Sequence, residues 1–269
     1  MSHDTTTRAW VLSLQEGHIM NEDIDAVNRM RAITLSREYG SGGGEIASRL
    51  AKRLGWALID HAIVERTARE LGTSQEEAEA HDEHTEGRVS RVLNSMLYLS
   101  PASMVIAPPE AFLSDEVYRS AVNKLVRAAA VRGHVVIVGR ASQVILAGLR
   151  DVLHVRILAP FEKRVAYVMQ REGLDQHAAE SRIHTKDHDR ARHLEMEYHQ
   201  KLEDGHLYDL VLNTSLLDLE SAVEVICFTL QQKAKGLATK TGELGPARGV
   251  SRYPNQPGDF RLLTHRFEE

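Results

Sequence analysis

Short apolar runs alternate along this chain with longer segments whose apolar residues recur at helical spacing. The runs predict strands at residues 32–36, 57–60, 134–138, 152–158 and 209–213. Helical patterns separate most of these strands. Strands that alternate with helices typically form a parallel sheet that is covered on both faces, so the pattern predicts an α/β fold.

Residues typical of helix ends support this pattern. Ser114, which is followed by two acidic residues, begins a predicted helix that ends at Gly133. Pro160, at a first helical position, begins another that ends at Gly173. Both helices lie between predicted strands, as the α/β pattern requires.

Four stretches depart from the alternation. Residues 1–31 form an extension before the first strand, and residues 237–269 lack apolar periodicity and predict a flexible tail. The stretch 65–132 is too long for a simple crossover, and its helical pattern around Val89, Val92 and Leu93 predicts a small inserted helical subdomain. Residues 174–205 form a second irregular region.

A glycine-rich loop follows the first strand. Gly40, Gly42, Gly43 and Gly44 come directly before a segment in which Ile46, Leu50 and Leu54 share one helix face. Glycines let successive N–H groups point at one anion at a helix N-terminus, so the order of strand, loop and helix predicts phosphate binding. The alternative is a glycine-rich turn that binds nothing.

The loop departs from the common phosphate-binding pattern G-x-x-x-x-G-K-[ST]. When Gly42 is aligned with the second glycine, Gly43 stands at the lysine position and Gly44 at the hydroxyl position. Arg37 stands at the position of the first glycine of this pattern.

Positive charge, which phosphoryl transfer requires, occurs at three places. Arg37 precedes the loop, Arg140 ends the third strand, and a late cluster holds Arg182, Lys186, Arg190 and Arg192. Ligands of open α/β sheets bind at the carboxyl ends of the strands, so Arg140 and the loop should lie at the same edge. The alternatives are a solvated arginine at a strand end and a mixed-charge surface helix.

Two further features are weaker signals. Asp60 ends the second strand, where an acidic side chain can face a ligand, although aspartate is also common in turns. Six histidines lie between His177 and His206, and His184 and His188 could share a helix face in a zinc site. No third ligand has clear spacing, so we expect no metal site.

Composition limits the classes of protein. The chain has 269 residues and a formal charge of −5, which argues against a protein that coats nucleic acid. The single cysteine, Cys227, excludes an intrachain disulfide and is expected to be a small core residue in a reducing compartment. No apolar run suits a membrane helix, and residues 1–31 lack the order of a secretory signal, so we expect a cytoplasmic protein.

Residues 33–43 (ITLSREYGSGG) resemble the opening of the cytidylate kinase-like family, whose members are relatives of the nucleoside monophosphate kinases in the P-loop NTPase group. The resemblance covers residues 32–233. It continues through residues 58–60 (LID), 138–141 (VGRA), 187–191 (DHDRA) and 209–214 (DLVLNT).

The resemblance implies a three-layer P-loop NTPase-type fold with a five-stranded parallel sheet. A helical insertion within residues 65–132 would bind the acceptor, and a lid within residues 174–205 would exclude water. The implied reaction transfers a phosphoryl group from ATP, with Mg²⁺, to a nucleoside monophosphate such as CMP or dCMP. The implied partners are these small molecules, with no nucleic acid and no membrane.

The resemblance also implies roles for single residues. The donor phosphates would lie on the loop formed by Gly40, Ser41, Gly42, Gly43 and Gly44. The acceptor would contact Asp60 and Arg140. The transferring group would be neutralised by Arg190, helped by Lys186 or Arg182, and Asp187 would belong to the lid. Because Gly43 and Gly44 carry no charge, we also predict that Arg37 helps to neutralise this group.

Two departures from the relatives leave alternatives open. Gly43 and Gly44 replace the lysine and the hydroxyl residue of the better-known kinases, and Ala141 stands where cytidylate kinases proper have aspartate. The chain could therefore be a nucleotide-binding sensor or scaffold without catalysis. It could also be a kinase for another small metabolite.

Overall fold

The computed structural model describes residues 26–60 and 115–245. Three predictions therefore lie largely outside the described residues. They concern most of the N-terminal extension, the inserted helical subdomain around Val89, Val92 and Leu93, and most of the C-terminal tail.

Five parallel strands form one sheet, in the order β2-β3-β1-β4-β5. They are β1 (Ala32–Arg37), β2 (Ala57–Ile59), β3 (Val135–Val138), β4 (Val152–Leu158) and β5 (Leu210–Asn213). The strand β1 lies in the centre and pairs along its length with β4 and with β3. All five predicted strands are confirmed, and none of their ends is shifted by more than one residue.

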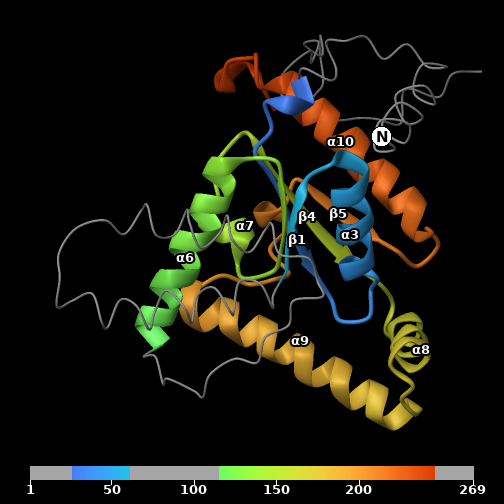
Figure 1. Ribbon diagram of the computed structural model, residues 1–269. Coiled ribbons are helices and arrows are strands. Elements are labelled where there is room, and N and C mark those ends of the chain that lie inside the picture. The colour runs from blue at the N-terminus through green and yellow to red at the C-terminus, as the bar shows by residue number, and fades with distance from the viewer. Residues whose placement is uncertain (1–25, 61–114, 246–269) are drawn as a thin grey trace, which may run out of the picture.

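Helices cover both faces of the sheet (Figure 1). The helices α3 (Gly43–Leu54) and α10 (Leu219–Gly236) cover one face, and α6 (Asp115–Arg132) and α7 (Ser142–Ile145) cover the other. Because neighbouring strand residues point to opposite faces, Ile33 and Leu35 pack with α3 and α10, whereas Ala32 packs with α6. This is the predicted three-layer α/β fold.

The predicted helix ends are largely confirmed. Gly133 follows the last residue of α6, and α8 (Phe161–Glu172) ends before Gly173. Pro160 is the residue before the first turn of α8 rather than within it. Cys227, on α10, is buried and free as expected, and burial raises the pKa of its thiol to about 11.

The region predicted to be irregular, residues 174–205, is mostly one continuous helix. This helix, α9, runs from Gln176 to Tyr198, and a short 3-10 turn, η1 (Gly205–Leu207), follows it. Asp175 caps α9 by accepting a hydrogen bond of 2.8 Å from the N–H of Ala178. Only Ala179, Ile183 and Leu194 are buried, so the apolar periodicity of this helix is too sparse to predict it.

Segments near both ends of the described chain contact the rest of the fold. Ala26 and Met30, within the predicted extension, are buried in the core beneath α10. Arg150 donates hydrogen bonds to the carbonyl oxygens of Gly236 and Thr239, just before the 3-10 turn η2 (Thr241–Glu243). No helix in the described part of the chain is both long and apolar enough to span a membrane.

A buried histidine joins the central strands. His154 Nδ1 on β4 lies 2.8 Å from the hydroxyl oxygen of Thr34 on β1, and the backbone N–H of His154 donates to the carboxylate of Asp209. The carboxylate of Asp209 is also paired with Lys233 at 2.5 Å. Burial is the main cause that lowers the pKa of His154 to about 4; Asp209 opposes the shift and the nearby Lys233 adds to it.

This burial predicts a loss of stability in mild acid. The unfolded histidine takes up a proton as the pH falls below 6.5, whereas the folded one stays neutral until about pH 4. The free energy of unfolding should therefore fall between pH 6.5 and pH 4, by about 2 kcal/mol from this residue at pH 5. Urea denaturation of wild type and His154→Gln at pH 7.5 and pH 5 measures this contribution. Equal losses in both proteins would contradict it.

Candidate active site

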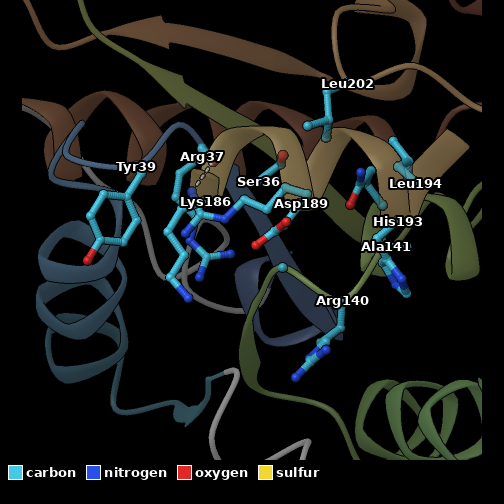
Figure 2. A pocket seen from close by; sticks show the side chains of 13 residues that line it. Ser36, Arg37, Tyr39, Arg140, Ala141, Lys186, Asp189, His193, Leu194 and Leu202 are labelled. Carbon is cyan, nitrogen blue, oxygen red and sulfur yellow. Dashed lines mark hydrogen bonds between the residues drawn. The ribbon is translucent and has the colours of Figure 1, made fainter. Parts of the chain in front are cut away.

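The helix α9 crosses the edge of the sheet where the strands have their carboxyl ends (Figure 1). Residues spaced by three or four along α9 lie on one face of the helix and line a cavity of about 420 Å³. Figure 2 shows these side chains and those that come from the strand ends. The lining residues are Ser36, Arg37, Tyr39, Gly139, Arg140, Ala141, Gln143, Lys186, Asp189, Arg190, His193, Leu194 and Leu202.

The cavity concentrates positive charge. Its described lining holds four cationic side chains and one carboxylate, that of Asp189. Burial, together with the charges of Arg190 and Arg140, lowers the pKa of Arg37 to about 10, while Asp60 opposes the shift. Burial also lowers the pKa of Arg190. Four cationic side chains against one carboxylate suit a ligand with several negative charges.

A strained turn presents Arg140 to the cavity. Gly139, Arg140 and Ala141 follow β3 with φ angles of +76°, +57° and +52°. Two non-glycine residues in succession in the left-handed region are unusual, and such strain is found mostly at functional sites. The guanidinium of Arg140 lies 5.9 Å from the ring centroid of Tyr118 on α6.

The glycine loop is held between α8 and α10. Gly42 has a φ of +79°, and a Cβ atom there would lie 2.7 Å from Leu219 on α10. A Cβ atom on Gly40 would lie 2.9 Å from the carbonyl oxygen of Arg164 on α8. The hydroxyl of Thr214 donates to the carbonyl oxygen of Ser41 at 3.0 Å. The loop thus needs glycine at two positions, and its residues 40–44 lie beside the cavity rather than in its lining.

A carboxylate from α9 contacts the backbone of the loop. Asp187 accepts a hydrogen bond of 2.7 Å from the N–H of Tyr39 and pairs with both Arg164 and Arg190. Arg190 also donates to the carbonyl oxygen of Arg37, at 3.2 Å, and Arg164 donates to that of Tyr39. Asp187 thus connects α8, α9 and the loop at one point.

The structure brings together most of the predicted site residues. Arg37, Arg140, Lys186 and Arg190 all line the cavity, and Asp60 at the end of β2 acts on Arg37 through its charge. Arg182 does not line the cavity.

Arg182 instead pairs with Glu172 on α8. Glu172 also accepts a hydrogen bond from the hydroxyl of Tyr39. A predicted lid residue therefore lies in the contact between α8 and α9, near the loop but away from the cavity lining.

Sequence reasoning missed Arg164 and His193. Arg164 has a side chain only 10% exposed, and its Nε lies 3.5 Å from Glu38 Oε2. The signal for it was present, since Arg164 shares a helix face with Val168 in an amphipathic helix. His193 lines the cavity, and burial followed by the charge of Arg140 lowers its pKa.

The histidines of α9 do not gather into a group of metal ligands. His184 packs on Phe161, with ring centroids 4.9 Å apart. Within residues 26–60 and 115–245, no group of three or more histidine, cysteine, aspartate or glutamate side chains could hold a metal ion.

The parallel sheet, the glycine loop after its central strand and the cationic cavity define an α/β protein of the P-loop NTPase type. The model of the cytidylate kinase-like family matches residues 32–216, which is more than half of the chain. The chain belongs to this family.

The individual proteins that match this chain are only distantly similar to it. A cytidylate kinase from Ignicoccus hospitalis is 26% identical over 198 residues, which cover 73% of this chain and 97% of that protein. A uronate isomerase from Corynebacterium glutamicum is 31% identical over 98 residues, but these are only 36% of this chain and 19% of that protein. The crystal structure of an uncharacterized protein from Eubacterium ventriosum matches with a TM-score of 0.55 and 20% identity, over 74% of this chain and 98% of that one.

The position of Asp187 predicts that it competes with anions for the loop. Its carboxylate occupies one backbone N–H and two guanidinium groups that an anion could otherwise contact. Charge-assisted hydrogen bonds contribute about 1.5–3 kcal/mol, so Asp187→Asn should bind inorganic triphosphate roughly tenfold more tightly. Calorimetric titration at low salt measures this.

Asp189→Asn is the matched control for this prediction. It removes the same charge from the same helix, and Asp189 lines the cavity but makes none of these bonds. Triphosphate that binds both variants equally well would show that only the net charge matters and not the position of Asp187.

Proposed function

We propose that this protein transfers a phosphoryl group from MgATP to a nucleoside monophosphate, with CMP or dCMP as the acceptor. The observation that carries the proposal is the cavity of four cations beside a glycine loop at the carboxyl edge of the sheet, in a chain of a kinase-like family. The similarity to a cytidylate kinase supports the choice of acceptor. Mg²⁺ enters the site with ATP as part of the substrate.

The glycine loop would receive the donor phosphates. Residues 40–44 lead into α3, whose N-terminal N–H groups favour an anion. The phosphate oxygen of the acceptor would attack the γ-phosphorus of ATP, and the bond to the β-phosphate oxygen would break to release ADP. Catalysis of this kind depends mainly on positioning and on neutralising charge.

The acceptor phosphate would contact Arg140. Its strained turn presents a guanidinium group, which can bind phosphate with two hydrogen bonds. Asp60, one strand away, would face the remainder of the acceptor.

The transferring group would be neutralised from α9. Arg190 and Lys186 lie one helical turn apart and both line the cavity. Arg190 already donates to the backbone of Arg37, beside the loop. A helix across the edge of the sheet also limits access of water, which would otherwise hydrolyse ATP.

One observation favours a second candidate function. Gly43 and Gly44 lack the ammonium and hydroxyl groups of the common phosphate loop. A protein that binds a nucleotide as a sensor or scaffold, without transfer, would need neither group.

An assay of ATP consumption tests the proposed reaction. Purified protein is incubated with MgATP and, in separate reactions, CMP, dCMP, UMP, AMP, GMP, shikimate or gluconate. We expect ADP to form in step with CDP or dCDP and much more slowly with the other acceptors. Turnover of only a non-nucleotide acceptor would indicate a kinase for another metabolite. Tight binding of MgATP without turnover of any acceptor would establish the sensor.

Arg140→Ala is the site variant for the same assay. Loss of a charge-assisted contact of about 1.5–3 kcal/mol should raise the KM for the monophosphate at least tenfold. The KM for ATP should change little. An equal rise in both constants would indicate general damage to the edge of the sheet instead.

Arg190→Ala tests the role of α9 in the transfer step. A cation that contacts the transferring group contributes about 10³–10⁵ in rate in related systems, so we expect kcat to fall at least ~10²-fold. The affinity for ATP should be nearly unchanged, because the contact forms mainly in the transition state. Arg192→Ala, at an exposed position on the same helix, is the control. A kcat unchanged in Arg190→Ala would remove this residue from the mechanism.

A further inference from the structure

Two unusual residues of the glycine loop lie against each other. Compared with the pattern G-x-x-x-x-G-K-[ST], Arg37 replaces the first glycine and Gly43 replaces the lysine. Each change alone alters the charge of the loop, and together they leave its number of cationic side chains unchanged. The packing of the two residues shows how the changes are related.

Gly43 has no room for a side chain because Arg37 fills the space. A Cβ atom on Gly43 would lie 2.7 Å from Cβ and 3.0 Å from Cγ of Arg37. Gly43 is the first residue of α3 and does not have a positive φ, so the restriction is one of space and not of backbone conformation. The next residue, Gly44, has open space around its Cα. A lysine at position 43 would therefore have to displace the side chain of Arg37.

The side chain of Arg37 extends from the end of β1 to the end of β3. Its Nη1 atom is in contact with the Cα side of Gly139, where an added Cβ would overlap it. Gly139 directly precedes the strained turn that carries Arg140. The side chain of Arg37 thus lines the cavity and reaches Gly139; Figure 2 shows Arg37 among the side chains that line it.

The negative charges around the guanidinium of Arg37 only partly balance the positive ones. Arg140 and Arg190 line the same cavity and both disfavour its charge, and Asp60 and Asp187 offset them only in part. Cations that repel each other in a buried site destabilise the empty protein. A bound polyphosphate would relieve this repulsion.

We propose that Arg37 contacts the phosphates of ATP in place of the absent lysine, and that residues 37 and 43 form a compensating pair. The arginine supplies the charge from the first position of the loop, and the glycine at position 43 makes room for its stem. This inference rests on the proposed function for the identity of the ligand. It makes the loop a rearranged phosphate site instead of a degraded one.

The first experiment measures binding without turnover. The probe is the non-hydrolysable ATP analogue AMP-PNP with Mg²⁺, titrated by calorimetry into wild type and Arg37→Gln. Glutamine keeps most of the stem and removes the charge, so the fold should survive, which circular dichroism and thermal unfolding check. We expect the Kd to rise at least roughly tenfold. An unchanged Kd in a folded Arg37→Gln protein overturns the proposal.

The second experiment is a double-mutant cycle that compares wild type, Arg37→Gly, Gly43→Lys and the double variant. Gly43→Lys alone should lower the melting temperature and weaken AMP-PNP binding, because the new stem overlaps Arg37. Arg37→Gly combined with Gly43→Lys should recover both properties relative to Gly43→Lys alone, which is the signature of coupled residues. Gly44→Lys, in open space, is the control and should be as stable as wild type. If the effects of the two single substitutions on stability and on AMP-PNP binding are simply additive, residues 37 and 43 are not coupled and the proposal is overturned.

Failure of this proposal can be distinguished from failure of the proposed reaction. If no acceptor is phosphorylated but Arg37→Gln still binds AMP-PNP more weakly than wild type, the reaction is wrong and the role of Arg37 stands. If CMP is phosphorylated and Arg37→Gln binds and turns over like wild type, the reaction stands and the role of Arg37 is wrong.

Discussion

The hydrogen bond from the N–H of Tyr39 to Asp187 is the contact on which the candidate site depends. It attaches α9 to the glycine loop, and the same carboxylate pairs with Arg164 from α8 and Arg190 from α9. Without this negative charge the arginines would repel one another across the loop. Because α9 carries Lys186 and Arg190 along one face, this attachment also places two of the four cations in the cavity.

The second constraint is the burial of positive charge at the edge of the sheet. A folded domain rarely keeps several arginines in one cavity unless they have a partner. Here Asp60, Asp187 and Asp189 balance the charge in part, and the arrangement suits a ligand that carries more than one phosphate. Membership of a kinase-like family and the positive charge of the cavity are separate observations, and both indicate a ligand that carries phosphate groups.

The glycine loop shows why a sequence motif should be judged by the packing of its residues as well as by their identity. Judged by the sequence motif alone, Gly43 and Gly44 indicate a phosphate loop that has lost its functional groups. The two positions differ in space, because Gly43 abuts Arg37 whereas Gly44 faces open space. A substitution that appears to remove a function can thus accompany another that supplies the same charge from a different residue.

The amino-acid sequence by itself determined the strands, the amphipathic helix α3 and most helix ends, because these depend on local periodicity and on glycine or proline at single positions. It also placed Arg37 and Arg140 at the ends of predicted strands. Only the tertiary structure decided that residues 176–198 form one helix, that Asp187 contacts Tyr39, and that Arg164 joins them. The physical reason is that these features depend on contacts between residues distant in the chain, and α9 has too few apolar positions to show its periodicity before it packs.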